Sequence, residues 1–280
     1  MVLYLNGRWL DAAAAAVPVR DAGFLHGDGV FETARLHRGG YFRLGTHLER
    51  LRQGGDLLRL TVPPADHLVQ IARELIGRNG LEEGTLRIVL TRGGAAGPTL
   101  LVTLEPIALD WQQRAARGWR IITARTRRPP VESIPAQLKT IGRVHSLLAR
   151  AERPDGIDDV LLLTVNGDVC EGPSWSIFWR KGDLLRTPSA AAGALEGVTS
   201  ATILDLAPGH GFAVEAGVWP RAELDTADEV FATMSSLGVV SVRELDGRTL
   251  RSDRAAHILQ QTYWSKVAAE TKAEQGTDRA

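Results

Sequence analysis

Lysine is the residue type that first points to chemistry in this chain. Only Lys139, Lys181, Lys266 and Lys272 occur, and arginine supplies the other 29 of the 33 basic residues. Because an ammonium group loses its proton far more readily than a guanidinium, lysine can act as a nucleophile or base where arginine cannot. Three of the four lysines fall in a predicted turn or a polar C-terminal segment, whereas Lys139 precedes the apolar run 147–149. Lys139 is therefore the candidate catalytic residue, although a packed stem with its ammonium group in water would give the same pattern.

One carboxylate and two hydroxyl-bearing turns accompany this lysine. Glu171 ends a predicted hairpin, Val198-Thr199 opens a predicted helix, and Ser235-Ser236 follows a predicted strand. A lysine amine condenses with an aldehyde, and a carboxylate opposite a ring nitrogen keeps that nitrogen protonated, so that the ring becomes an electron sink. Helix N-terminal N–H groups and hydroxyls bind phosphate. Together these residues suit a phosphorylated aldehyde cofactor, although each alone could be an ordinary surface or turn residue.

Composition excludes several other classes of protein. The 280 residues are 44% hydrophobic with no formal net charge, which is enough for a sizeable core and gives no support to a nucleic-acid partner. The single cysteine suits a reducing compartment. The first residues do not form a basic segment followed by a long apolar one, and no apolar run approaches the ~20 residues that span a bilayer. We expect a cytoplasmic protein with no membrane partner, and the histidine spacing predicts no metal site.

Apolar spacing and turn residues predict an α/β (α+β) chain with two domains. Residues 1–110 are predicted to form a small α/β domain and residues 111–118 a connector. Residues 119–280 are predicted to form a larger, strand-rich domain that carries Lys139 and ends in a tail, at about 272–280, that we expect to be mobile. The predicted elements are a hairpin turning at Asn6-Gly7, helices from 46 and over 66–79, strands 85–91 and 99–104, strand 119–124, helix 141–151, hairpins 158–171 and 174–186, a helix from 197, strands 227–236 and 239–245, and helix 253–271.

Several segments, in order along about residues 3 to 250, resemble the class IV (fold type IV) pyridoxal-phosphate enzymes. That family includes branched-chain and D-amino-acid aminotransferases and 4-amino-4-deoxychorismate lyase. The resemblance implies a fold with a small N-terminal and a larger C-terminal α/β domain, pyridoxal 5'-phosphate in the cleft between them, and a homodimer. The matching segments are 21–33, 47–51, Lys139-Thr140, 169–172, 176–178, 195–199 and 227–231.

The resemblance also implies a role for each matching site residue. Lys139 takes the place of the Schiff-base lysine and Glu171 that of the partner of the pyridine nitrogen. The residues in the places of phosphate ligands are Arg50, Val198, Thr199, Ser235 and Ser236.

The subfamily is indicated by smaller features. The run that begins at Phe31 lacks the Phe-Glu-Gly of branched-chain enzymes, and residues 91–98 lack the Arg-x-His pair of D-amino-acid aminotransferases. Residues 23–27 and 178–183 are most similar to bacterial aminodeoxychorismate lyases. Four residues depart from the family's usual pattern, which puts the substrate in doubt more than the cofactor: Gly142, Ser146, Trp175 and Ser200.

The leading hypothesis is a lyase that converts 4-amino-4-deoxychorismate to 4-aminobenzoate and pyruvate in folate biosynthesis. Phe31, Arg92 and Arg143 are the candidates for substrate binding. The two arginines are chosen because substrate carboxylates need cationic partners. The alternative is a class IV aminotransferase acting on branched-chain or D-amino acids with a 2-oxo acid acceptor. A third interpretation is a relative that binds the cofactor but has lost its chemistry.

Overall fold

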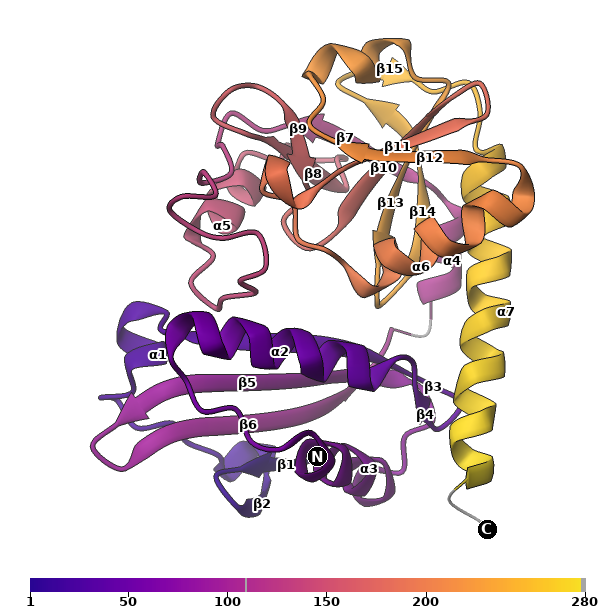
Figure 1. Ribbon diagram of the computed structural model, residues 1–280. Coiled ribbons are helices and arrows are strands. Elements are labelled where there is room, and N and C mark those ends of the chain that lie inside the picture. The colour runs from indigo at the N-terminus through magenta and orange to yellow at the C-terminus, as the bar shows by residue number, and fades with distance from the viewer. Residues whose placement is uncertain (109, 278–280) are drawn as a thin grey trace. The chain divides into compact units, whose positions relative to one another are not determined.

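The computed structural model describes residues 1–108 and 110–277, which divide into two compact units (Figure 1). The first unit contains Met1–Ala108, the short segment Gln137–Arg143, and the chain from Val267 on. The second contains the described part of Leu109–Ala136 and all of Val144–Lys266. Both units mix helices and strands, as the sequence predicted.

A six-stranded sheet with the order β2-β1-β6-β5-β3-β4 forms the first unit. The turn between β1 and β2 has positive φ at Asn6 (46°) and Gly7 (83°), so the predicted hairpin is confirmed. β5 and β6 form the long hairpin seen in Figure 1. The elements are β1 (Val2–Leu5), β2 (Arg8–Asp11), α1 (Ala22–His26), β3 (Gly29–His37), β4 (Gly40–Tyr41), α2 (Leu44–Leu58), α3 (Ala65–Asn79), β5 (Gly84–Gly94) and β6 (Gly97–Pro106).

The core of this unit lies between the sheet and helices α2 and α3. Alternate residues of β3 point into it, including Val30, Ala34 and Leu36, because successive side chains of a strand face opposite sides of the sheet. Leucines at helical spacing on α2 and α3 pack against them. Phe31 lies between two core positions of β3 and therefore faces the opposite side of the sheet.

The segment Gln137–Arg143 joins the first unit through backbone hydrogen bonds to β3. Phe31 N donates to Lys139 O at 3.0 Å, and Ile141 N donates to Gly29 O at 3.0 Å. The sequence placed this segment in the C-terminal domain because it lies between two stretches of that domain. Its pairing with β3 joins segments that are about 110 residues apart in the chain, and a local sequence pattern cannot predict such a contact.

A nine-stranded mixed sheet forms the second unit, with the path β12-β11-β10-β13-β14-β7-β8-β9 and with β15 beside β14. The segment expected to be a connector forms helix α4, whose Ala115 packs on Leu237 and Val240 in the core of this unit. The elements are α4 (Trp111–Ala116), β7 (Trp119–Thr123), α5 (Val144–Ala151), β8 (Asp159–Leu163), β9 (Val169–Glu171), β10 (Ser176–Lys181), β11 (Leu184–Pro188), α6 (Val198–Leu206), β12 (Ala213–Gly217), β13 (Glu229–Met234), β14 (Gly238–Leu245), β15 (Arg248–Thr249) and α7 (Arg254–Thr277).

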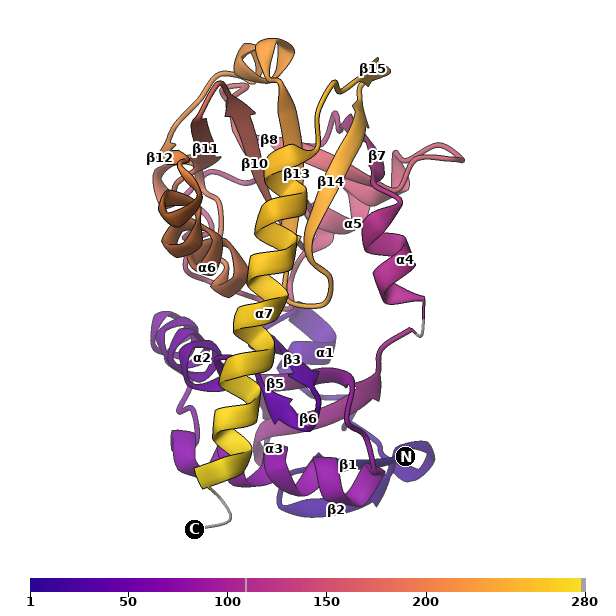
Figure 2. The same cartoon turned by 90° about the vertical axis from the view of Figure 1, so that its right-hand side faces the viewer.

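Helix α7 is longer than the sequence predicted. It extends to Thr277, so residues 272–277 of the expected mobile tail are helical, and residues 278–280 lie outside the described residues. Up to Lys266 the helix belongs to the second unit, where it lies against β13 and β14 (Figure 2). Within the described part of the chain, no helix is both long and apolar enough to cross a membrane.

Candidate active site

Lys139 lies against the aromatic ring of Phe31 in the first unit. Its Nζ is 4.8 Å from the ring centroid, and Phe31 is only 3% exposed. The backbone bonds that pair residue 139 with β3 place Lys139 and Phe31 on the same side of the sheet. The predicted catalytic amine is thus half-buried on an aromatic surface and held there by main-chain pairing rather than by a flexible loop.

Two arginines share this aromatic surface with Lys139. The guanidinium carbon of Arg143 is 4.7 Å from the Phe31 centroid, and that of Arg87 is 4.4 Å from it. Sequence analysis named Arg143 but missed Arg87, which lies on β5 opposite Thr33. Arg87 lies on the same face of the sheet as Phe31, because its partner Thr33 is two residues from Phe31 and side chains alternate along a strand. Three cationic groups therefore meet at one ring, an arrangement suited to an anionic ligand.

Arg92, the other predicted substrate-binding arginine, makes different contacts. Its guanidinium donates to Asp28 at 2.5 and 3.2 Å and to the carbonyl oxygen of Leu58 at 2.7 Å. These bonds fix Arg92 between β3 and the end of α2. A role in substrate binding stays a prediction for Arg92, and Arg87 is better placed for it.

Arg50 is held by a buried network on the opposite side of β3. Its Nε and Nη2 donate to the two carboxylate oxygens of Glu32 at 2.6 and 2.9 Å, and Nδ1 of His47 lies 2.8 Å from Oε2. Burial alone would raise the pKa of Glu32, but the hydrogen bond from His47 and the charge of Arg50 lower it to about 2. Burial also lowers the pKa of His47, so that a neutral imidazole donates from Nδ1 to an ionised Glu32. The network fixes the orientation of Arg50, the predicted phosphate ligand of this unit.

Glu171 stands at the end of β9 in the second unit with both carboxylate oxygens bonded. Oε1 accepts from Arg128 Nε at 3.2 Å, and Oε2 accepts from the backbone N–H of Leu195 at 2.9 Å. Leu195 lies two residues before Gly197, the N-cap of α6. The carboxylate is therefore bonded to the segment that leads directly into the predicted phosphate-binding helix start.

The N-terminus of α6 and the turn after β13 are linked through β10. Ser176 of β10 pairs with Glu171 on one side and with Thr233 on the other. A Cβ on Gly197 would lie 3.1 Å from Ser176 Oγ, so the start of α6 approaches this strand closely. The second unit thus brings Glu171, Val198 and Thr199 together, with the Ser235-Ser236 turn following two residues after Thr233.

This cluster has the features of a site for a polar ligand. Among the described residues, no side chain accepts a capping hydrogen bond from the N–H groups of the first turn of α6. Thr233 is 2% exposed, and its hydroxyl has no hydrogen-bond partner among the described residues. Buried hydroxyls are normally bonded, so one left without a partner beside an uncapped helix start is consistent with a ligand that supplies acceptors.

Trp175, one of the four departures from the family pattern, has a structural role. It is buried, and its Nε1 donates to Asp159 at 3.1 Å. A Cβ on Gly172 would fall 1.9 Å from the Trp175 ring, so Gly172 is needed to make room for it. Gly142 lies in a close backbone approach, because a Cβ on it would lie 3.2 Å from the carbonyl oxygen of Gly27. Neither departure removes a polar contact described above for the unit in which it lies.

These features define a class of protein: an α/β enzyme in which one compact unit presents a lysine and the other an uncapped helix start beside a fixed carboxylate. The amino-transferase class IV family matches residues 29–245, and the chain belongs to that family. It is 32% identical to a provisionally assigned branched-chain-amino-acid aminotransferase of Methanocaldococcus jannaschii, covering 92% of each chain. It is 30% identical to the aminodeoxychorismate lyase of Bacillus subtilis, covering 95% of this chain and 94% of that one.

Comparison of the fold with solved structures also finds a class IV enzyme. A branched-chain amino acid aminotransferase of T.th., crystallised with pyridoxamine 5'-phosphate, matches with a TM-score of 0.90 at 26% identity, covering 98% of this chain and 96% of that one. The fold class predicted from the sequence, an α/β fold type IV enzyme, is confirmed by this match.

Proposed function

We propose that this class IV enzyme converts 4-amino-4-deoxychorismate to 4-aminobenzoate and pyruvate. The cofactor of the chain is pyridoxal 5'-phosphate, on the evidence of its family and of the T.th. structure. When bound, this cofactor supplies an electron sink for charge that develops on the substrate carbon bearing nitrogen. The residues we assign to hold it are Lys139, Glu171, Arg50, Val198, Thr199, Ser235 and Ser236.

The described residues fit such a group. A phosphate would be bound by the uncapped N–H groups of α6, by the hydroxyl of Thr199 and by the Ser235-Ser236 turn. Arg50, the phosphate ligand that the family resemblance implies in the first unit, is oriented by Glu32. Glu171 is the carboxylate that would hold a proton on the ring nitrogen, and its two bonds to Arg128 and Leu195 fix its direction.

The three cationic groups at the Phe31 ring, which are Lys139, Arg87 and Arg143, are the reason for proposing this substrate. A branched-chain amino acid has one carboxylate, whereas aminodeoxychorismate has two, one on its ring and one on its enolpyruvyl group. Arg87 and Arg143 lie on the same ring as Lys139, so two carboxylates could be bound close to the reacting amine. The aromatic face of Phe31 suits a cyclic substrate better than a short aliphatic one.

Lys139 would then move the proton that the reaction requires. Its Nζ takes the proton from the substrate carbon that bears nitrogen, and loss of the enolpyruvyl oxygen substituent as pyruvate leaves an aromatic ring. The atoms balance without an oxidant or a second substrate, because aminodeoxychorismate has the combined composition of 4-aminobenzoate and pyruvate. Phe31 positions Nζ for this transfer and shields it from water on one side.

The test is to supply aminodeoxychorismate to the purified holoenzyme and to measure 4-aminobenzoate and pyruvate. We expect equal amounts of both products. Arg87→Met should raise KM for this substrate with little change in kcat, since a positioning charge outside the reacting atoms is lost. Arg78→Met is the matched control, because Arg78 lies 4.4 Å from the Trp9 ring in the same unit but not at Phe31. Absence of 4-aminobenzoate at high enzyme concentration would refute the lyase proposal.

An aminotransferase is the second candidate, and the M. jannaschii and T.th. relatives favour it. In this case the same cations would bind the carboxylate of a branched-chain or D-amino acid, or the carboxylates of the 2-oxo acid acceptor. Incubation with branched-chain amino acids, or with D-amino acids, and 2-oxoglutarate distinguishes the two proposals. An aminotransferase gives a new 2-oxo acid that depends on the amino donor, and a lyase gives none. A holoenzyme inert with every donor and with aminodeoxychorismate would support the third interpretation, a relative without activity.

The apolar face of α5 supports the proposed homodimer. Val144, Leu147 and Leu148 lie at helical spacing and each is more than half exposed. Exposed apolar patches of this kind commonly mark protein interfaces. We expect sedimentation analysis to give twice the chain mass, and Leu147→Glu to shift the protein toward monomer. A wild-type monomer at micromolar concentration would contradict this part of the proposal.

A further inference from the structure

Gln260 of α7 is bonded to the turn that follows β13. Its Oε1 accepts from the backbone N–H of Val239 at 2.6 Å, and its Nε2 donates to the carbonyl oxygen of Leu237 at 3.1 Å. One amide side chain thus satisfies a backbone donor and a backbone acceptor on either side of Gly238. Ser235 and Ser236 precede these residues directly, so Gln260 fixes the turn that carries both hydroxyls.

Gly238 makes this contact close. Its φ is +73°, in the left-handed region that favours glycine. A Cβ there would lie 2.6 Å from Gln260 Oε1 and 3.0 Å from Cδ1 of Tyr263. The turn therefore lies directly on α7, with no room for a side chain between them.

Tyr263, one turn further along α7, reaches the other predicted phosphate-binding element. Its hydroxyl lies 3.3 Å from Thr199 Oγ1, and both residues are buried. Thr199 is in the first turn of α6. Because the side chains at i and i+3 of a helix lie on the same face, Gln260 and Tyr263 can contact the two elements together.

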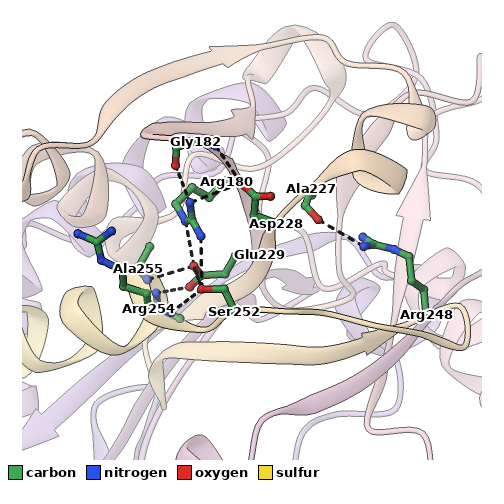
Figure 3. A network of polar contacts seen from close by, with 10 residues as sticks. Arg180, Gly182, Ala227, Asp228, Glu229, Arg248, Ser252, Arg254 and Ala255 are labelled. Atoms are coloured by element: carbon green, nitrogen blue, oxygen red, sulfur yellow. Dashed lines mark hydrogen bonds and ion pairs between the residues drawn. The ribbon is translucent and has the colours of Figure 1, made fainter.

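The start of α7 is anchored to β13, the strand that leads into the same turn. Glu229 of β13 is fully buried and accepts from the backbone N–H groups of Ala255 (3.1 Å) and Ala256 (2.7 Å). Arg180 donates to the same carboxylate at 3.0 Å (Figure 3). A carboxylate at a helix N-terminus is favourable, and here it belongs to a strand rather than to the helix itself. It fixes where α7 begins and therefore where Gln260 and Tyr263 lie.

We propose that Gln260 and Tyr263 are positioning residues for the cofactor phosphate, acting through the Ser235–Leu237 turn and through Thr199. The proposal rests on the proposed cofactor site. No feature of the sequence indicated either residue, since both lie in an apparently ordinary amphipathic helix. Their effect should be specific for the phosphate group, because Tyr263 contacts Thr199 and Gln260 contacts the backbone of the Ser235–Leu237 turn and of Val239.

The experiment compares two ligands that differ only in the phosphate. Full-length protein freed of cofactor is titrated with pyridoxal 5'-phosphate and with pyridoxal, and binding is followed by tryptophan fluorescence. We expect Tyr263→Phe and Gln260→Leu each to weaken pyridoxal 5'-phosphate roughly fivefold, the size of one net hydrogen bond, and to change pyridoxal less than twofold. The matched controls are Tyr41→Phe, which removes a buried hydroxyl bonded to Ala72 in the first unit, and Gln261→Leu, the exposed neighbour on α7.

A second comparison separates positioning from general loosening of the fold. If Tyr263 acts through Thr199, then Tyr263→Phe should have no further effect on pyridoxal 5'-phosphate affinity in a Thr199→Val background. Equal weakening of both ligands, or full additivity with Thr199→Val, would overturn the proposal. So would unchanged affinity in both variants. Wild-type protein that binds neither ligand would instead refute the cofactor site itself, which keeps the two failures distinct.

Discussion

Replacement of Glu32 by glutamine tests the buried network under Arg50 most directly. Glu32→Gln keeps the shape of the side chain but removes its charge, which leaves the Arg50 guanidinium without its bidentate carboxylate. The folded pKa of about 2, against 4.5 for an ordinary glutamate, corresponds to about 3 kcal/mol of stability at pH 7. Loss of one member of a buried ion pair costs a similar amount, because the remaining charge stays buried.

The depressed pKa of Glu32 also fixes how its contribution to stability changes with pH. A carboxylate with a depressed folded pKa stabilises the protein above its unfolded pKa of about 4.5, and this contribution is lost as the pH falls toward about 2. At pH 3 roughly 1 kcal/mol should remain, by the same linkage relation. Urea unfolding of the wild type and of Glu32→Gln, followed by circular dichroism, should therefore give a difference that is about 2 kcal/mol smaller at pH 3 than at pH 7.

Glu49 lies on α2, the helix that carries Arg50, and supplies a matched control. Its pKa is also lowered to about 2, first by the hydrogen bond from Arg52, but it is exposed to solvent. Water and salt screen such a pair, so Glu49→Gln should change stability little at either pH. A wild-type-minus-Glu32→Gln difference that stays constant from pH 7 to pH 3, or that is no larger than that of Glu49→Gln, would refute the reasoning.

The remaining predictions concern single positions. Borohydride treatment of the holoenzyme should fix the cofactor to Lys139, so Lys139→Ala should lose the label and Lys181→Ala should keep it; a label on any other lysine would contradict the assignment. Gly238→Ala should lower the unfolding free energy by about 1–3 kcal/mol, because a side chain there meets Gln260 at a positive φ; an unchanged melting temperature would count against this. Burial raises the pKa of the Cys170 thiol well above its usual range, so the folded protein should not react with a thiol reagent until it unfolds, and rapid labelling of native protein would show otherwise.

Local signals in the sequence predicted the elements whose ends are set by single residues. Asn6-Gly7 predicted the first hairpin, and the predictions of a helix over 66–79 and of a hairpin over 158–171 agree with α3 and with the β8–β9 pair. Gly80 caps α3 and Gly167 lies between β8 and β9, both with positive φ. Such signals work because positive φ or a missing N–H is a property of the residue itself, independent of its distant neighbours.

The interactions that position the candidate site are long-range, and for that reason the sequence did not predict them. The pairing of residue 139 with β3 joins segments about 110 residues apart, and the contact between Thr199 and Tyr263 joins segments 64 residues apart. Arg87 shows an intermediate case. Strand alternation places it on the face of Phe31, but only the register between β3 and β5 shows that it reaches the ring.

The scarcity of lysine has a structural explanation in the buried carboxylates. A planar guanidinium binds a carboxylate through two parallel hydrogen bonds, whereas an ammonium group acts as a point charge. Three carboxylates with a proposed role in orienting the site are held by arginine. Glu32 accepts two hydrogen bonds from Arg50, and Glu171 and Glu229 accept from the Nε atoms of Arg128 and Arg180. These three pairs fit the preference for arginine where a carboxylate must be oriented, and the role of Lys139 as the Schiff-base lysine stays a prediction. The three pairs are Glu32 with Arg50, Glu171 with Arg128, and Glu229 with Arg180.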